Sequence, residues 1–190
     1  MFRARWPILT LALTYLLSLV IGVVMVHRGA GFAVSRRDQL VMHGERNDSS
    51  SLAFQKGHTF QAIAIEFGRE CYRTVLKTAI GLTVVLPYPL AVRGGWYGGI
   101  LSIDSNHVSQ LGDPAGALYY LGFELLQIAS ASLAGGAGIN LTLASIRRRS
   151  GYDGDRWLRV PKAAIHDLLR IYLLVFPLLL AAAIWKYFIP

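Results

Sequence analysis

Charge is scarce in this chain and cysteine is almost absent. Of its 190 residues, 16% are Asp, Glu, Lys or Arg and 54% are hydrophobic, whereas soluble domains carry about 25% charged residues. This composition is typical of a multi-spanning membrane protein with short loops, and it leaves too little polar sequence for an independent soluble domain. The single cysteine, Cys71, excludes an intramolecular disulfide and any metal site built from several cysteines.

Acidic residues are also few. The chain has 11 Asp and Glu against 19 Lys and Arg, which gives a formal net charge of +8. In membrane proteins the basic residues concentrate in loops that remain in the cytoplasm. We therefore expect the basic segments to meet membrane lipids or an acidic protein partner, and not nucleic acid.

Motifs of enzyme chemistry are lacking. The five histidines are scattered without the spacing of metal ligands, and neither a Walker A sequence nor a Gly-x-Ser-x-Gly element is present. The enzymatic alternative is an intramembrane serine hydrolase, but nothing in the spacing requires nucleophile and base to meet. Its candidate groups are Ser102 or Ser130 with His107 or His166. We expect no enzymatic activity, no cofactor and no metal.

Long apolar runs are what the chain does have. Five crossings are predicted within one membrane domain over 1–190, at residues 6–26, 75–92, 96–111, 114–145 and 165–188. The first run carries no charge and can cross about 30 Å of hydrocarbon; a signal peptide is the alternative, but no clear cleavage site follows. The run 96–111 is either a short crossing or a re-entrant segment. The sequence predicts an all-α membrane protein with about five transmembrane helices and an interfacial amphipathic helix.

Proline and glycine are concentrated in one region. Pro87 and Pro89 fall in the last turns of the 75–92 run, where each removes a backbone donor and clashes with the preceding turn. Two glycine pairs follow them, Gly94 with Gly95 and Gly98 with Gly99. We expect the helix to kink or break over this region.

The long polar connection, residues 27–73, is expected to hold the amphipathic helix outside the cytoplasm. Apolar residues recur there at helical spacing, while charged residues that continue as far as Lys77 share another face. The apolar set is Phe60, Ile63, Phe67 and Cys71, and the charged set is Glu66, Glu70, Arg73 and Lys77. This pattern predicts a helix that lies at the membrane interface or packs on the rest of the protein.

The distribution of basic residues predicts the orientation. The connection between the last two crossings carries the densest basic group: Arg147, Arg148, Arg149, Arg156 and Arg159. Placing this group at the inner face also puts the N-terminus, with Arg3 and Arg5, in the cytoplasm.

The fourth crossing combines an acid with very small side chains. At helical spacing Glu124, Gln127, Ala131, Gly135 and Gly138 fall on one stripe. Small residues let membrane helices approach closely, and an acid at membrane depth must face protein or water. The stripe is therefore expected to be a packing seam, within the chain or between subunits, or to place Glu124 in a proton or substrate pathway.

Three short segments carry a resemblance to a known family. "LGFELLQIASASLAGGAG" (Leu121 to Gly138), the terminal "YFIP" (Tyr187 to Pro190) and "RGGWYGGI" (Arg93 to Ile100) resemble the stage II sporulation protein M family of bacterial and archaeal membrane proteins. The resemblance covers about residues 60 to 190. Leu121 stands where the family has His, and Gly94 where it has Asn, so Glu124 and the glycines are what carries over.

The resemblance implies a non-enzymatic component of the cytoplasmic membrane, whose namesake helps to assemble a cell-wall-degrading complex. The first hypothesis is therefore a scaffold of a bacterial or archaeal envelope complex, which assembles with itself or with other envelope proteins. The alternative is the membrane subunit of a transporter or permease. It rests on the expected break at Pro87 and Pro89, because discontinuous helices often mark transport sites.

Overall fold

The computed structural model describes residues 4–47, 49–104, 107–146, 156–157 and 160–188. Within them the chain is helical apart from a two-stranded ribbon, which confirms the predicted all-α class. The elements are α1 (Arg5–His27), α2 (Gly31–Asn47), α3 (Ser49–Gln55), α4 (Thr59–Gly81), α5 (Pro87–Ile100), α6 (Pro114–Ile146), β1 (Arg156–Trp157), β2 (Val160–Pro161) and α7 (Lys162–Phe188).

Three helices among the described residues are long and apolar enough to cross a membrane: α1, α6 and α7. They correspond to the predicted crossings 6–26, 114–145 and 165–188. In each of them the exposed side chains are largely apolar, as in helices that face lipid.

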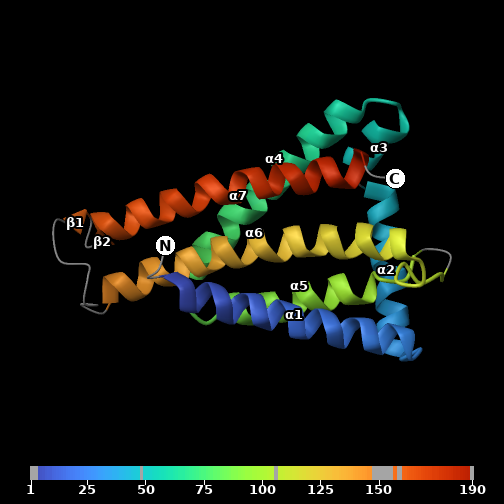
Figure 1. Cartoon of the computed structure of the whole chain (residues 1–190), viewed down its shortest axis with the longest axis horizontal. Coiled ribbons are helices and arrows are strands. Elements are labelled where there is room, and N and C mark those ends of the chain that lie inside the picture. Colours follow the sequence, from blue (N-terminus) through green and yellow to red (C-terminus); the bar gives the residue numbers. More distant parts are fainter. Residues whose placement is uncertain (1–3, 48, 105–106, 147–155, 158–159, 189–190) are drawn as a thin grey trace.

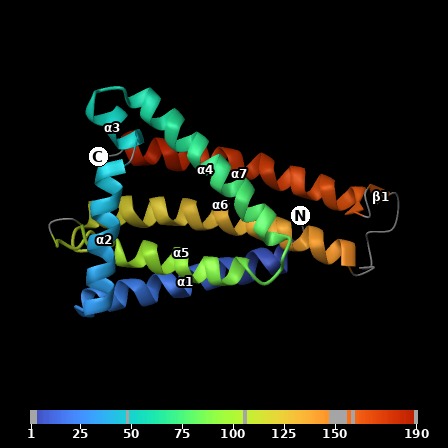
Figure 2. The same cartoon turned by 180° about the vertical axis from the view of Figure 1, so that it is seen from behind.

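The helices form an elongated bundle (Figure 1). The helices α1, α5, α6 and α7 run side by side along it, α4 crosses α6 and α7 obliquely, and α2 lies across one end (Figure 2). Helix α1 begins toward the end that carries β1 and β2, whereas the C-terminus lies at the opposite end beside α2 and α3 (Figure 1).

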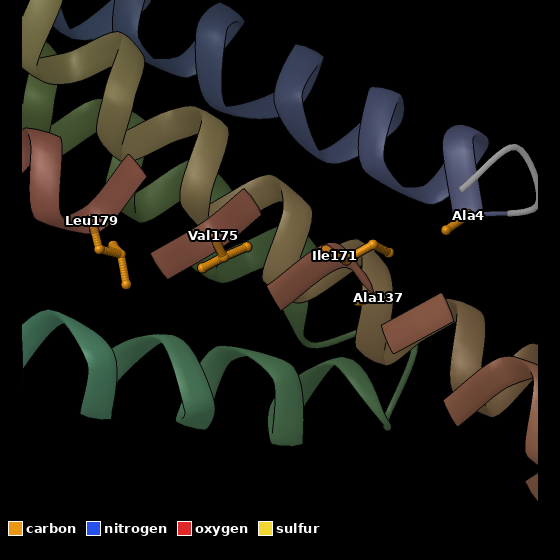
Figure 3. Packing of buried hydrophobic residues seen from close by; sticks show 5 residues of the cluster. All are labelled: Ala4, Ala137, Ile171, Val175 and Leu179. Carbon is orange, nitrogen blue, oxygen red and sulfur yellow. The ribbon is translucent and has the colours of Figure 1, made fainter. Parts of the chain in front are cut away.

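A row of branched side chains on α7 supplies the largest buried apolar cluster. Ile171, Val175 and Leu179 repeat every four residues and are buried against Ala137 of α6 and Ala4 (Figure 3). Residues at this spacing lie on one helix face, so a single stripe of α7 packs on its neighbours while the opposite face stays exposed.

The second and third predicted crossings are wrong in their boundaries. The run 75–92 is divided, because α4 ends at Gly81 and α5 begins at Pro87. Proline is favoured at the first helical position, where its missing N–H is not needed, so Pro87 starts a helix here. The run 96–111 is not one helix: α5 ends at Ile100, and residues 101–104 and 107–113 form a turn-rich connection with a bridge between Ile103 and Ser109.

The glycine pairs do not break the helix either. They lie inside α5, where Gly95 and Gly99 are buried against α1. A Cβ on Gly99 would lie 2.8 Å from the Cα of Gly22 in α1, and a Cβ on Gly22 would lie 2.6 Å from the carbonyl oxygen of Trp96. Absence of side chains therefore lets two backbones meet. The signal that indicated a break marks a close helix contact instead.

The expected amphipathic helix, α4, packs against the bundle, which is the second of its two expected placements. Both of its expected faces are partly covered. Glu66 and Glu70 are 4% and 5% exposed, and of the apolar set Ile63 is 9% exposed, while Phe67 and Cys71 pack against the Ala137 cluster. Tyr72 and Val75, which belong to neither set, are 67% and 54% exposed. The element that lies across the end of the bundle is α2 (Figure 1).

Candidate functional site

The small-residue stripe of α6 is used within the chain. Ala131, Gly135 and Gly138 are buried, and a Cβ on Gly81 of α4 would lie 2.7 Å from the carbonyl oxygen of Gly135. The Thr78 hydroxyl of α4 also donates to the Ala134 carbonyl oxygen of α6 at 3.1 Å. The stripe is thus the seam between α4 and α6 in the monomer.

The polar end of the stripe faces a cavity. Glu124 and Gln127 line a cavity of about 500 Å³ between α4, α5 and α6, with Lys186 of α7 at its edge. Opposite Glu124 is a glycine of α5: a Cβ on Gly98 would lie 2.5 Å from Oε2 of Glu124. Among the described residues, the Glu124 carboxylate makes no hydrogen bond or ion pair.

Charged side chains from four helices line this cavity. Three are acidic and five are basic: Glu66, Glu70 and Glu124, with Arg69, Arg73, Lys77, Arg93 and Lys186. Most come from α4, whose charged residues repeat at intervals of three or four and therefore share one helix face. Helix α5 supplies Arg93, and α6 forms the floor. Charge inside a helix bundle is costly and normally marks a pathway or binding site.

Glu66 is the centre of an ion-pair cluster at the edge of the cavity. Its Oε2 accepts from Arg69, from the Lys186 ammonium at 3.0 Å and from the Ser50 hydroxyl at 2.8 Å. Two cations and a hydroxyl thus surround one carboxylate oxygen, and the cluster links α4 to the last turns of α7.

The other acid of α4 is also neutralised locally. The Arg73 guanidinium donates to Glu70 at 2.7 Å, one turn along the same helix. Lys77 and Arg93 differ from these residues: within the described part of the chain, neither has a hydrogen bond or ion pair to a carboxylate. The Arg93 guanidinium lies over the Tyr97 ring instead, 5.1 Å from its centroid. Two cations in the cavity thus lack a direct bond to an acid, although Glu70 lies close enough to attract the Lys77 ammonium.

The groups of the hydrolase alternative are not brought together. His107 contacts Arg37 at 2.6 Å, and the Ser130 hydroxyl donates to the Gln127 carbonyl oxygen at 3.0 Å. A different pair, His27 and Ser109, is 2.8 Å apart on the exposed surface. No group of three His, Cys, Asp or Glu side chains that could hold a metal occurs among the residues described.

The predicted basic patch is described only in part. Arg147, Arg148, Arg149 and Arg159 lie outside the described residues, and Arg156 begins β1 opposite Pro161. The charged cavity was not predicted as a site, although its pattern on α4 is visible in the sequence as an acid or base at every helical turn from Glu66 to Lys77. The expected amphipathic helix places these side chains on one face, but nothing in the sequence places a cavity beside that face.

Comparison with protein-family models, with curated proteins and with solved structures finds no match for the chain.

Proposed function

We propose that the protein is the membrane subunit of a transporter or permease and holds a polar solute in the cavity between α4, α5 and α6. The observation that carries this proposal is the cavity itself, about 500 Å³ in volume and lined by charged side chains from four helices. A scaffold requires no such interior. Solute sites of transporters lie between helices of the bundle and are often formed by interrupted ones, here α4 and α5.

The proposal includes five crossings in a bacterial or archaeal cytoplasmic membrane, with the N-terminus inside. Helices α4 and α5 would be the two crossings added to α1, α6 and α7. Helix α4 has 23 residues and spans about 35 Å, whereas the 14 residues of α5 span about 21 Å, short of a full bilayer core. A short helix whose glycines pack on α1 suits the wall of a central site.

Glu124 has the chemistry of a coupling residue in this scheme. Its carboxylate faces the cavity from α6 and has no charged partner among the residues described. An acid in such a place can take up or release a proton, or bind a donor group of the solute. Replacement by glutamine keeps the shape and removes the charge, so flux in proteoliposomes should be abolished by Glu124→Gln while the protein remains folded.

The first experiment asks whether the cavity is open to water. In a Cys71→Ala background, Gln127→Cys should react with a membrane-impermeant maleimide added to membranes or proteoliposomes, because Gln127 lines the cavity. Leu125→Cys is the matched control: Leu125 lies on the same helix and is 54% exposed on its outer, apolar face. If neither cysteine reacts with the maleimide added on either side of the membrane, the proposal is refuted.

A scaffold role, as the resemblance to the sporulation family implies, is the second candidate. It is favoured by large apolar side chains that α2 and α3 leave exposed: Phe32, Met42, Leu52 and Phe54. The α6 stripe cannot serve as the assembly surface, because α4 already covers it. If the scaffold role is correct, Met42→Ser together with Leu52→Ser should reduce crosslinked complexes, and Glu124→Gln should have no effect on them.

A further inference from the structure

We infer that the cavity takes a phosphate group, which is held between Lys77 on the α4 wall and Arg93 on the α5 wall. This inference rests on the proposed function and specifies the chemistry of its ligand. The phosphate could belong to a lipid headgroup or to free phosphate, and the two sources differ in what else must fit into the cavity.

The charge balance of the lining favours an anion. Glu66 binds two of the five basic residues, Arg69 and Lys186, and Glu70 binds Arg73. Lys77 and Arg93 have no such bond to a carboxylate among the described residues, although Glu70 also attracts the Lys77 ammonium. Five basic and three acidic side chains leave an excess of positive charge, and a cleft with such an excess concentrates ligands of the opposite sign.

Positive charge from α2 and α5 is concentrated around Tyr97, a cavity residue of α5. Two guanidinium groups share the ring of Tyr97, with Arg36 5.4 Å and Arg93 5.1 Å from its centroid. Arg36 also donates to the Tyr97 hydroxyl oxygen at 2.8 Å. Two cations on one ring repel each other, and a phosphate beside them would relieve that repulsion while using the planar donors that arginine offers to phosphate oxygens.

The cavity is large and carries cations on two helices. Its volume is about 500 Å³, and its lining includes Lys77 of α4 and Arg93 of α5. The cavity therefore admits a group larger than a single ion and presents cations from both sides. Glu124 on the floor leaves a carboxylate for any donor group attached to the phosphate.

The experiment uses the purified full chain in a neutral detergent and isothermal titration calorimetry. The probes are inorganic phosphate, dihexanoyl phosphatidylglycerol below its critical micelle concentration, and dihexanoyl phosphatidylcholine as the probe without net charge. Saturable binding of phosphatidylglycerol alone would identify a headgroup, and binding of inorganic phosphate would identify a soluble ligand. Binding of phosphatidylcholine as strong as that of phosphatidylglycerol, or binding of no probe, would overturn the inference.

Variants locate the binding. Lys77→Gln and Arg93→Gln should each weaken binding of the anionic probe by about tenfold, since each removes one charge-assisted contact. Lys56→Gln and Arg28→Gln remove the same charges from exposed positions outside the cavity and should leave binding unchanged. Equal weakening by cavity and control variants would mean non-specific attraction and would refute the site.

If Lys77→Gln does not give a folded protein, Lys77→Arg should keep both the charge and the binding. Arg93→Gln is then the cavity variant that is compared with the exposed controls. Labelling of Gln127→Cys without anion binding would refute the phosphate site but not the transport proposal. Absence of labelling would refute the transport proposal itself, whatever the calorimetry shows.

Discussion

Gly81 of α4 and Gly138 of α6 face each other with no side chain between them. A Cβ on either residue would lie 2.9 Å from the Cα of the other. The contact brings the two backbones together just before α4 ends, and nearby the Thr142 hydroxyl of α6 donates to the Leu82 carbonyl oxygen at 2.9 Å. The angle and depth of α4, and with them the cavity, depend on this approach.

Replacing Gly138 by alanine should therefore destabilise the protein. The new methyl group would meet backbone atoms of α4, which cannot move as a flexible side chain does, so we expect a loss of about 1–3 kcal/mol. Thermal unfolding of the purified variant in detergent measures this loss. Gly68→Ala is the control, because a Cβ on Gly68 would have no neighbour within 4 Å. Alanine there should stabilise α4 by up to about 1 kcal/mol, and equal behaviour of the two variants would contradict the contact.

The pair of Glu66 and Lys186 should show energetic coupling. Their side chains meet at 3.0 Å and are 5% and 28% exposed, so the interaction is mostly shielded from water. In a double-mutant cycle with Glu66→Gln and Lys186→Met, we expect a coupling free energy of about 1–3 kcal/mol. Thermal unfolding in detergent supplies the four stabilities. Strictly additive effects would show that the pair does not form.

Arg37 should hold α2 to the connection after α5. Its side chain is 2% exposed and contacts both Asp38 and, at 2.6 Å, Nε2 of His107. Arg37→Met keeps the length but removes the charge-assisted bonds, so we expect a loss of about 2 kcal/mol and faster amide hydrogen exchange in the α2 region. Arg28→Met, at an exposed position, should change neither quantity. Unaltered exchange in Arg37→Met would show that other contacts hold α2.

Much of the helix map followed from local pattern. The crossings at α1, α6 and α7 were predicted within a few residues of their observed ends, because an uninterrupted apolar run of this length can satisfy its backbone in lipid only as a helix. The two prolines mark the region where the helix is interrupted, but they do not show whether a helix ends or begins at them. The interruption lies before Pro87, which begins α5.

The glycines show how one local signal permits two structures. Glycine weakens an isolated helix, and it also allows two helices to touch. Gly95 and Gly99 allow two helices to touch, because the backbone of α1 packs against them and Gly22 lies opposite Gly99. A partner that is distant in sequence decides the outcome, so the residues of α5 alone could not predict it.

The amino-acid sequence by itself determined that the protein is helical, that three of its helices suit a membrane, and that α4 has one charged and one apolar face. Only the tertiary structure decided which neighbours cover each side of α4. Phe67 and Cys71 pack against the apolar cluster of α6 and α7. The acids of α4 are buried as well, because Arg69, Arg73 and Lys186 neutralise them. Lys186 lies 120 residues further along the chain than Glu66, so the pattern of α4 alone could not predict the cavity that these charges line.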